Sequence, residues 1–597
     1  MAILSSRRAE HICNRGVDYP ETSPGLEDPA SRSDLEGNPL SNDTRGNSIR
    51  TKRVDNANER RCVATARSDR RLEQMTTDTL SDRVWRYLHD TVRIDTRSLA
   101  VFRVFVGLLI VADILLRSRN FSFYYTDDGA MPQSLAMEMT PEGAFSVFFF
   151  VSDPTLIALL FVVYGLVGIQ LIVGYKTRIA TILAFLLVIS LDFHNPAVTS
   201  YADILFRLLL FWAIFLPLGE RWSIDAVHRD RSPRDSVTGV ASALILGQMV
   251  YMYLYNGYHK VENELWLSGE ATPLIMGLDD MTFLLAPYLR EFPTLLQLGG
   301  LTWFVMLLLS WLLIVLVGRP RAMFAGTFVI AHASFAVTVR IGAFAFVAIA
   351  GLVLFFQTQF WDDLVTLARS VNLEPARLAS KTATLERYVG RLPRLEINHE
   401  RYRRAKSGLY SIVLIAIVVS LVAMVVIPHT PLAAVDTVEE TSDGVDDTFS
   451  AFAVSQPDWT VFAPAPRTTD RYYVFAAMTD DRETIDIYNN RSLSYDRPEE
   501  ELQQQYDTYR ERFYMNTVRR HASDNRAGGA HVHLLEYYET TWPDEHDTEL
   551  STVNIYAVNE DITMETVTTP DERETEIDLL HKDSFDDSEA FEIDPPE

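Results

Sequence analysis

The sequence predicts a polytopic α-helical membrane protein with about nine transmembrane helices, a C-terminal extracytoplasmic α+β domain and disordered termini. Three observations support this fold class. Runs of about twenty apolar residues recur through the middle of the chain, and a helix needs about that length to cross a bilayer. Basic side chains gather in alternate loops between these runs. The region after the last run is acidic and contains strand-like apolar segments.

The first 74 residues predict a disordered segment. They are rich in Arg, Ser, Asn, Asp and Gly, have no hydrophobic period, and lack the continuous apolar core of a signal peptide. The composition changes at Met75, so residues 1–74 can also be read as an over-extended gene start. Both cysteines, Cys13 and Cys62, lie in this segment. We therefore expect no disulfide framework and no metal site in the rest of the chain.

Nine apolar runs predict the membrane helices. They are residues 98–117, 154–174, 178–193, 203–219, 238–259, 296–318, 321–339, 342–360 and 408–427. The first eight belong to a predicted transmembrane domain, residues 75–360. A basic, amphipathic stretch, residues 361–407, predicts a linker that lies along the cytoplasmic surface before the last helix.

Loop charge predicts the orientation of these helices. Arginines precede the first helix, and four more stand between residues 221 and 234; the short loops 175–178 and 318–321 and the end of the linker are also basic. All of these fall on one side if nine helices alternate, and the positive-inside rule makes that side cytoplasmic. The sequence therefore predicts a multi-pass protein of the cell membrane, with a cytoplasmic N-terminus and an extracellular C-terminal domain.

The C-terminal region predicts an acidic folded domain over residues 428–570 and a disordered acidic tail over 571–597. Residues after 428 include about forty acidic and about a dozen basic side chains, which accounts for the net charge of −26. Such a surface suits a halophilic, very salty environment and repels nucleic acid. Tyr472–Ala477 and Val553–Val558 predict strands, and residues 499–518 predict a helix.

Polar side chains inside apolar spans are costly and need a partner or a cavity. Asp203 and Arg207 lie four residues apart on one face of the fourth helix, which predicts a structural ion pair. Gln248, Asn256 and Lys260 share a face of the fifth helix. Lys260 has two interpretations: a lysine that snorkels to the membrane surface, or a base at the mouth of a cavity.

The predicted topology brings a second titratable group to the same side. His194 ends the third helix where Lys260 ends the fifth, so both can line one outward-opening pocket. We expect Tyr255, Asn256, Tyr258, His259 and Trp266 to contribute to this pocket. A lysine in apolar surroundings loses proton affinity and can act as a base, and a neutral histidine can donate a hydrogen bond to an oxyanion. A histidine at a helix end can equally be a structural interfacial residue.

These segments resemble a known family. Asn256-Gly-Tyr-His-Lys-Val-Glu-Asn-Glu-Leu-Trp266 is similar to the sequence around the catalytic lysine of vitamin K-dependent γ-glutamyl carboxylases. His194-Asn-Pro, followed by Asp203-Ile-Leu-Phe-Arg207 and the apolar run after it, resembles their third and fourth helices. The microbial branch of this family is the horizontally transferred transmembrane (HTTM) domain. The resemblance covers about residues 90–360, and Gln456-Pro-Asp-Trp459-Thr-Val-Phe462 also resembles microbial members.

The resemblance implies an enzyme. Lys260 would match the base that deprotonates a reduced quinone, menaquinol or a vitamin K-like molecule; oxygen then adds, an epoxide forms, and carbon dioxide is added to glutamate of an exported protein, a lyase reaction. His194 would match the histidine that supports carboxylation. His259 stands where the animal enzymes have a second lysine, and the tryptophan comes one position later. Two alternatives stay open: a non-enzymatic membrane scaffold, and a protein that binds a lipophilic molecule without chemistry.

Overall fold

The structure is a computed structural model that describes residues 80–229, 231–371, 408–417, 444, 447–585 and 589–593. The residues from Asp82 onward form one unit. The predicted disordered segment 1–74, most of the linker 361–407 and the second half of the predicted helix 408–427 lie outside the described residues.

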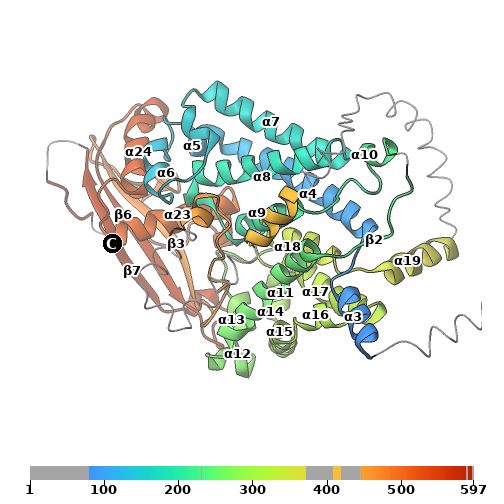
Figure 1. Cartoon of the computed structure of the whole chain (residues 1–597). Helices are drawn as coiled ribbons and strands as arrows, with labels where there is room; N and C mark the ends of the chain where they lie inside the picture. The colour runs from blue at the N-terminus through green and yellow to red at the C-terminus, as the bar shows by residue number, and fades with distance from the viewer. Residues whose placement is uncertain are drawn as a thin grey trace, which may run out of the picture. The chain divides into compact units, whose positions relative to one another are not determined.

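The first half of the described chain is a bundle of long helices, with α4, α7 and α8 side by side in Figure 1. Its helices are α3 (Leu80–Thr91), α4 (Thr96–Arg117), α5 (Phe121–Tyr125), α6 (Gln133–Glu138), α7 (Pro154–Val173), α8 (Thr177–His194), α9 (Tyr201–Ala213), α10 (Ile224–Val227) and α11 (Val240–Lys260). Short 3₁₀ turns cover Ser118–Asn120, Val147–Phe150 and Pro196–Val198, and a two-stranded ribbon pairs β1 (Ile94–Asp95) with β2 (Ser236–Val237).

Local sequence signals set where these helices begin and end. Asp153 accepts hydrogen bonds from the first turn of α7, and Pro154 occupies its first position, where its fixed φ suits a helix. Gly174 ends α7 in the left-handed conformation that glycine adopts without strain. Ser200 begins α9 with a capping box that is completed by Asp203. The predicted boundaries of α4, α7 and α8 are confirmed to within a few residues.

The helices that follow α11 are shorter and interrupted. They are α12 (Glu264–Ser268), α13 (Ala271–Met276), α14 (Ala286–Arg290), α15 (Pro293–Leu308), α16 (Leu312–Val315), α17 (Arg319–Phe335), α18 (Phe344–Val353) and α19 (Thr358–Ser370). The predicted span 342–360 is instead two helices, α18 and α19, bent by 99°. Gln357 lies at the bend, where its side chain bonds to the main chain of Gly318 and Asp90, and this polar anchor accounts for the turn.

Three helices in the described ranges are long and apolar enough to cross a membrane: Thr96–Tyr125, Pro154–Val173 and Thr177–His194. A fourth is added if α18 and α19 count as one bent span. The other predicted spans form helices of 10–21 residues or broken helices, so the count of nine stays a prediction.

The C-terminal domain is a five-stranded antiparallel sheet in the order β5-β4-β3-β6-β7, with two helices. Its elements are β3 (Thr469–Thr479), β4 (Thr484–Asp486), β5 (Arg491–Ser492), α23 (Tyr509–Ser523), α24 (Ala530–His546), β6 (Leu550–Asp561) and β7 (Thr575–Ser584), with 3₁₀ turns at Leu502–Gln505 and Pro570–Glu572. Both predicted strands are confirmed: they lie within the long central pair β3 and β6, most of whose residues are buried.

Two predictions about this domain were wrong. The chain after residue 570 forms β7, an edge strand, where a disordered tail was expected; nine residues pair with β6 through the backbone, which needs no apolar pattern. The helix predicted over 499–518 is α23, which begins only after Thr508, because that side chain accepts a hydrogen bond from Glu511 and caps the helix. Residues 499–508, including Tyr506, therefore precede the helix.

Candidate functional site

Lys260 is a buried lysine at the last position of α11, and its side chain turns inward rather than toward solvent. Only 1 % of the residue is exposed. Its Nζ donates to the carbonyl oxygen of Val461 at 2.7 Å and to that of Phe462 at 2.9 Å. The same nitrogen lies 3.9 Å from the centroid of the Trp266 ring. This geometry does not fit a lysine that snorkels.

Residues 456–462, the lid segment, bind along one face of α11. Gln248 exchanges hydrogen bonds with the side chain of Gln456. Asn256, two turns closer to Lys260, donates to the carbonyl oxygens of Trp459 and Val461 at 2.8 and 3.0 Å. The lid segment therefore binds to the polar face of α11.

Phe462 is the most tightly held residue of the lid segment. Its φ is 51°, in the left-handed region that non-glycine residues rarely adopt. Its carbonyl oxygen accepts hydrogen bonds from both Lys260 Nζ and Trp266 Nε1, the second at 2.9 Å. Strained backbone persists where its surroundings fix it, and here two buried donors do so.

The lid segment closes one end of a cavity of about 620 Å³. Helices α11, α13, α15 and α17 form its walls, and most lining side chains are apolar or aromatic. Lys260, Asn256 and Trp266 line it together with Trp459, Val461 and Phe462 of the lid segment. A mainly apolar cavity of roughly 300–1,000 Å³ with a few polar groups is typical of small-molecule sites.

A second polar pair lines the same cavity. Tyr253 Oη lies 2.8 Å from Nε2 of His332, which is fully buried in α17. Nδ1 of His332 has no hydrogen-bond partner among the described residues. The edge of the Trp303 ring meets Tyr253, Phe328 and His332. Sequence reasoning missed His332, although a histidine in an apolar helix is itself a signal.

The donors and acceptors around Lys260 suit an amine that gains and loses a proton. A neutral amine has two N–H groups and one lone pair, and the two lid carbonyls take both N–H groups. An ammonium has a third N–H, and the face of Trp266 is a favourable neighbour for that charge. The surroundings therefore satisfy both protonation states without a carboxylate partner.

The remaining predicted pocket residues lie outside the cavity lining. Tyr255 donates to a carboxylate oxygen of Asp458 at 2.9 Å, and its ring lies 4.6 Å from that of His259. Tyr258 is exposed. Among the described residues that line the cavity, none of these three side chains is found.

His194 also lies away from the cavity lining. Its ring stacks on Phe148 with centroids 4.8 Å apart, and Nε2 lies 3.2 Å from the carbonyl oxygen of Tyr125. It is not among the described residues that line the Lys260 cavity. The structure thus places Lys260 and His194 in separate surroundings.

His194 lies close to a buried charge cluster, because Tyr125, which contacts it, also accepts a hydrogen bond from Arg117. The cluster comprises Asp113, Arg117, Asp192, Asp203, Arg207 and Arg510. Within it, Arg207 pairs with Asp192 at 3.3 Å, whereas Asp203 pairs with Arg117 at 3.0 Å and with Arg510 at 2.9 Å. The two residues expected to pair each take another partner.

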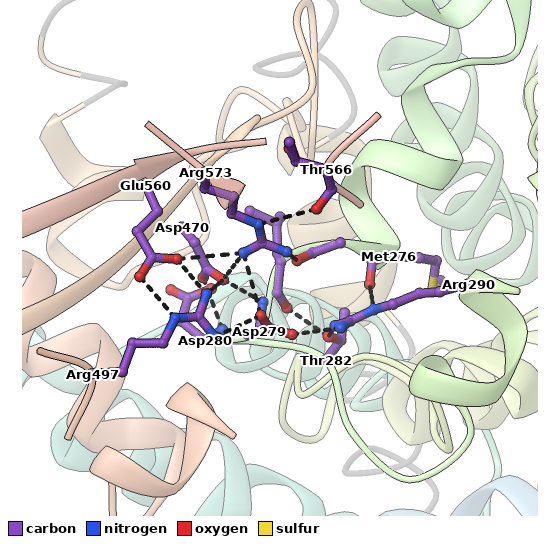
Figure 2. Close-up of polar contacts among 12 residues, drawn as sticks. Met276, Asp279, Asp280, Thr282, Arg290, Asp470, Arg497, Glu560, Thr566 and Arg573 are labelled. Atoms are coloured by element: carbon purple, nitrogen blue, oxygen red, sulfur yellow. Dashed lines mark hydrogen bonds and ion pairs between the residues drawn. The ribbon is translucent and has the colours of Figure 1, made fainter. Parts of the chain in front are cut away.

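A second cluster, here the interface cluster, joins the α13–α14 region to the C-terminal sheet (Figure 2). It contains the carboxylates Asp279, Asp280, Asp470 and Glu560 and the guanidinium groups of Arg290, Arg467, Arg497 and Arg573. Asp470 also accepts hydrogen bonds from the main-chain nitrogens of Asp279 and Asp280, at 2.6 and 2.9 Å. Four carboxyl groups face four guanidinium groups, the pairing that a buried ionic cluster needs. Burial and the neighbouring Asp280 and Asp279 raise the pKa of Asp470 to about 8, whereas Arg467 and the main-chain hydrogen bond from Asp280 favour its charged form.

The interface cluster reaches the cavity wall. Nε of Arg290 donates to the carbonyl oxygen of Met276, and the Met276 side chain lines the cavity with Ile275 and Leu289. The interface cluster therefore ties the C-terminal domain to the wall formed by α13. No single sequence motif indicated this cluster, because its members come from five separate stretches of chain.

Comparison with known proteins gives one match. Residues 92–361 match the model of the HTTM domain family. No curated protein and no solved structure matches the chain. The matched range contains α4 to α18 and thus Lys260 and most of the cavity wall, whereas the lid segment lies beyond it.

Proposed function

We propose that this chain, whose residues 92–361 match the HTTM domain family, is a membrane enzyme that oxidises a reduced quinone held in the Lys260 cavity. In this proposal Lys260 is the base. The observation that supports it most is the position of Nζ: buried at the end of an apolar cavity, bonded to two carbonyl oxygens and packed on Trp266.

The cavity suits a flat aromatic head group. Trp266, Trp303 and Trp459 supply aromatic surface, and a volume of about 620 Å³ accommodates a fused ring system. When bound, a reduced quinone supplies an acidic hydroxyl and the electrons that oxygen takes up. Lys260 Nζ accepts the hydroxyl proton on its lone pair, and the two carbonyls and the Trp266 ring hold the resulting ammonium.

The lid segment keeps water from this proton. Trp459 is fully buried, and the main chain of residues 459–462 is bonded to Asn256, Lys260 and Trp266. Exclusion of water strengthens electrostatic interactions inside a site and protects reactive species from hydrolysis. A lid that is bonded to the base itself links closure of the cavity to the position of the amine.

We limit the proposal to quinol oxidation with epoxide formation. Carboxylation of glutamate in an exported protein, which the family resemblance also implies, requires a second group near the reacting carbon. His194, the candidate for that role, lies in separate surroundings against Phe148 and Tyr125. Coupling to carboxylation is therefore an outcome of the experiment below rather than part of the proposal.

The test incubates the purified protein in lipid nanodiscs with reduced menaquinone, oxygen and labelled bicarbonate. Lys260→Met removes the amine but keeps an unbranched side chain, and Lys176→Met, in the turn between α7 and α8, is the matched control. We expect epoxide from the wild type and the control, and a loss of at least about a hundredfold in Lys260→Met, as for removal of a general base. Equal turnover in all three proteins would refute the role of Lys260 as the base. Incorporation of the bicarbonate label into protein would show that carboxylation accompanies epoxide formation.

A second candidate function is binding of a lipophilic molecule without chemistry. It is favoured by the observation that both hydrogen bonds of Nζ anchor main chain of the lid segment. In that case quinone binds to the wild type with a measurable Kd, and no protein forms epoxide. A scaffold without a ligand predicts no binding.

We further propose that the protein is multi-pass, with the C-terminal domain outside the cell. Arg229, Arg231 and Arg234 converge on buried Glu220 in the loop before α11, whereas Lys260 and the lid lie at the other end of that helix. A cysteine-free protein with Ser232→Cys or Glu545→Cys, treated in intact cells with an impermeant maleimide, tests this. We expect labelling of Glu545→Cys and not of Ser232→Cys. The opposite pattern would show that the C-terminal domain lies inside the cell.

A further inference from the structure

The wall of the Lys260 cavity between α15 and α17 is exposed on its outer side. Leu295 and Gly299 of α15 and Ile330 and Ser334 of α17 all line the cavity, yet each is also exposed. Leu295 is 56 % exposed and Ile330 is 70 % exposed. Residues that face both a cavity and the outside mark an opening rather than a closed wall.

The packing of the two helices explains the opening. α15 packs on α11 and α13, whereas α17 packs on α16 and α18. Trp303 of α15 bridges to α17 through edge contacts with Phe328 and Phe335, at centroid distances of 5.7 and 5.1 Å. One tryptophan thus spans a gap that is otherwise lined by small or flexible side chains.

Two adjacent glycines of α15 show which side of the helix is free. A Cβ at Gly300 would lie 2.1 Å from Oγ1 of Thr272, so this side is packed tightly on α13. A Cβ at Gly299 would meet no atom within 4 Å, although Gly299 lines the cavity. The opening therefore begins at Gly299.

The chemistry of the opening indicates what passes through it. α15 has no charged residue, and neither does α17 beyond Arg321. The exposed residues around the gap include Leu295, Leu298 and Ile330. A helix surface that exposes large apolar side chains and, apart from small hydroxyl residues such as Ser334, little that is polar is unfavourable in water and favourable in a bilayer. An apolar cavity that opens onto apolar helix surface in a membrane protein is continuous with the lipid.

We propose that the cavity opens sideways into the bilayer between α15 and α17, and that it takes a quinone with a long hydrocarbon chain. The ring lies beside Lys260, and the chain leaves past Gly299 and Ser334 into the lipid. This inference rests on the ligand class of the proposed function, but it concerns binding and does not depend on whether Lys260 is a base. It adds that a ligand enters and leaves by lateral diffusion, without passing the lid.

The test uses two probes, 2-methyl-1,4-naphthoquinone without a chain and menaquinone with its prenyl chain, and measures Kd by quenching of tryptophan fluorescence in nanodiscs. Gly299→Leu places a side chain at the opening: its Cβ would meet no atom within 4 Å, and a helical leucine is favourable. Gly326→Leu is the matched control: a Cβ at this glycine of α17 also meets nothing within 4 Å, and Gly326 is not among the described residues that line the cavity.

We expect Gly299→Leu to weaken binding of the long-chain probe by at least about tenfold, because the chain must be displaced, and to change binding of the chainless probe less than about twofold. Gly326→Leu should leave both constants unchanged. Ser334→Leu, on the facing helix, should reproduce the selective loss. Equal loss of both probes, or no loss of either, would overturn the opening between α15 and α17. A selective loss in Gly299→Leu, with no epoxide formed by any of the proteins, would leave the opening intact while refuting the proposed reaction.

Discussion

Arg573→Met should uncouple the C-terminal domain from the wall of the cavity. The Arg573 side chain is fully buried, and its Nη1 lies 3.2 Å from Asp279 and 3.1 Å from Asp470. Its Nη2 donates to the carbonyl oxygen of Gly277 at 3.0 Å, and Nε donates to that of Thr566 (Figure 2). Methionine keeps an unbranched apolar stem and has no charge and no donor, so the substitution removes these contacts.

The magnitude follows from the charge balance of the interface cluster. Loss of the Arg573 guanidinium leaves four carboxyl groups against three guanidinium groups, next to the fully buried side chain of Asp470. Removal of one partner from a buried ionic cluster costs about 3–5 kcal/mol, because the remaining charge is uncompensated. If this cost falls on the docking of residues 276–290, the undocked form of that segment becomes about two to four orders of magnitude more populated.

Hydrogen–deuterium exchange followed by mass spectrometry measures this population. The amides of Asp279 and Asp280 donate to Asp470 and should exchange faster by a similar factor in Arg573→Met. Arg482→Met, at an exposed position outside the cluster, is the control and should change nothing beyond about 0.5 kcal/mol. Glu560→Gln combined with Arg573→Met restores the charge balance and should recover part of the protection.

Unchanged exchange across residues 276–290 in Arg573→Met would refute the reasoning, since it would mean that the cluster adds nothing to docking. The same variant should weaken quinone binding, because Ile275 and Met276 line the cavity. If Arg573→Met weakened quinone binding while exchange across residues 276–290 stayed normal, the loss of binding would not come from undocking of this segment.

Two further predictions concern the C-terminal domain and the lid. Burial, together with neighbouring His581, lowers the pKa of His531 from 6.5 to about 4, so the folded protein binds this proton less readily than the unfolded chain. The free energy of unfolding is therefore highest above pH 6.5 and falls by about 2–3 kcal/mol as the pH decreases toward 4. His531→Leu should flatten this loss in thermal melts between pH 7 and 4.5, and an unchanged pH profile would contradict the assignment. Trp459→Phe keeps a ring against Tyr201 and loses one hydrogen bond, so it should cost about 1 kcal/mol, whereas Trp459→Ala should cost about 3–5 kcal/mol in unfolding experiments; equal losses would show that the ring is not what packs.

Apolar runs predicted the first helices well, as the run before Arg117 shows. The Asp153-Pro154 start of α7 is a further local signal, which the structure brought to light. Hydropathy failed where a helix is apolar but interrupted, as at Gln357, because the polar anchor that bends the chain has its partners far away in sequence. It also failed for β7, an edge strand held by backbone pairing.

The candidate site was predictable only on the side of α11. The spacing of Gln248, Asn256 and Lys260 showed that one face of α11 is polar, and all three side chains on that face bind the lid segment. Its partners are mostly main-chain carbonyls of the lid segment, and a carbonyl has no sequence signature. The separation of His194 from the cavity was likewise beyond reach, because two groups at one membrane depth can still lie on different sides of a bundle.

The candidate site extends beyond the residues that match the HTTM domain family. Residues 92–361 supply Lys260 and the walls, but every hydrogen-bond acceptor that the structure gives Nζ comes from the lid segment. Without residues 461 and 462, the amine would face an open apolar cavity with both donors unpaired, a costly arrangement that would drive the side chain outward. The position of the base is thus a property of the helical domain and the C-terminal region together, so the lid, and not the matched domain alone, determines whether Lys260 points into the cavity.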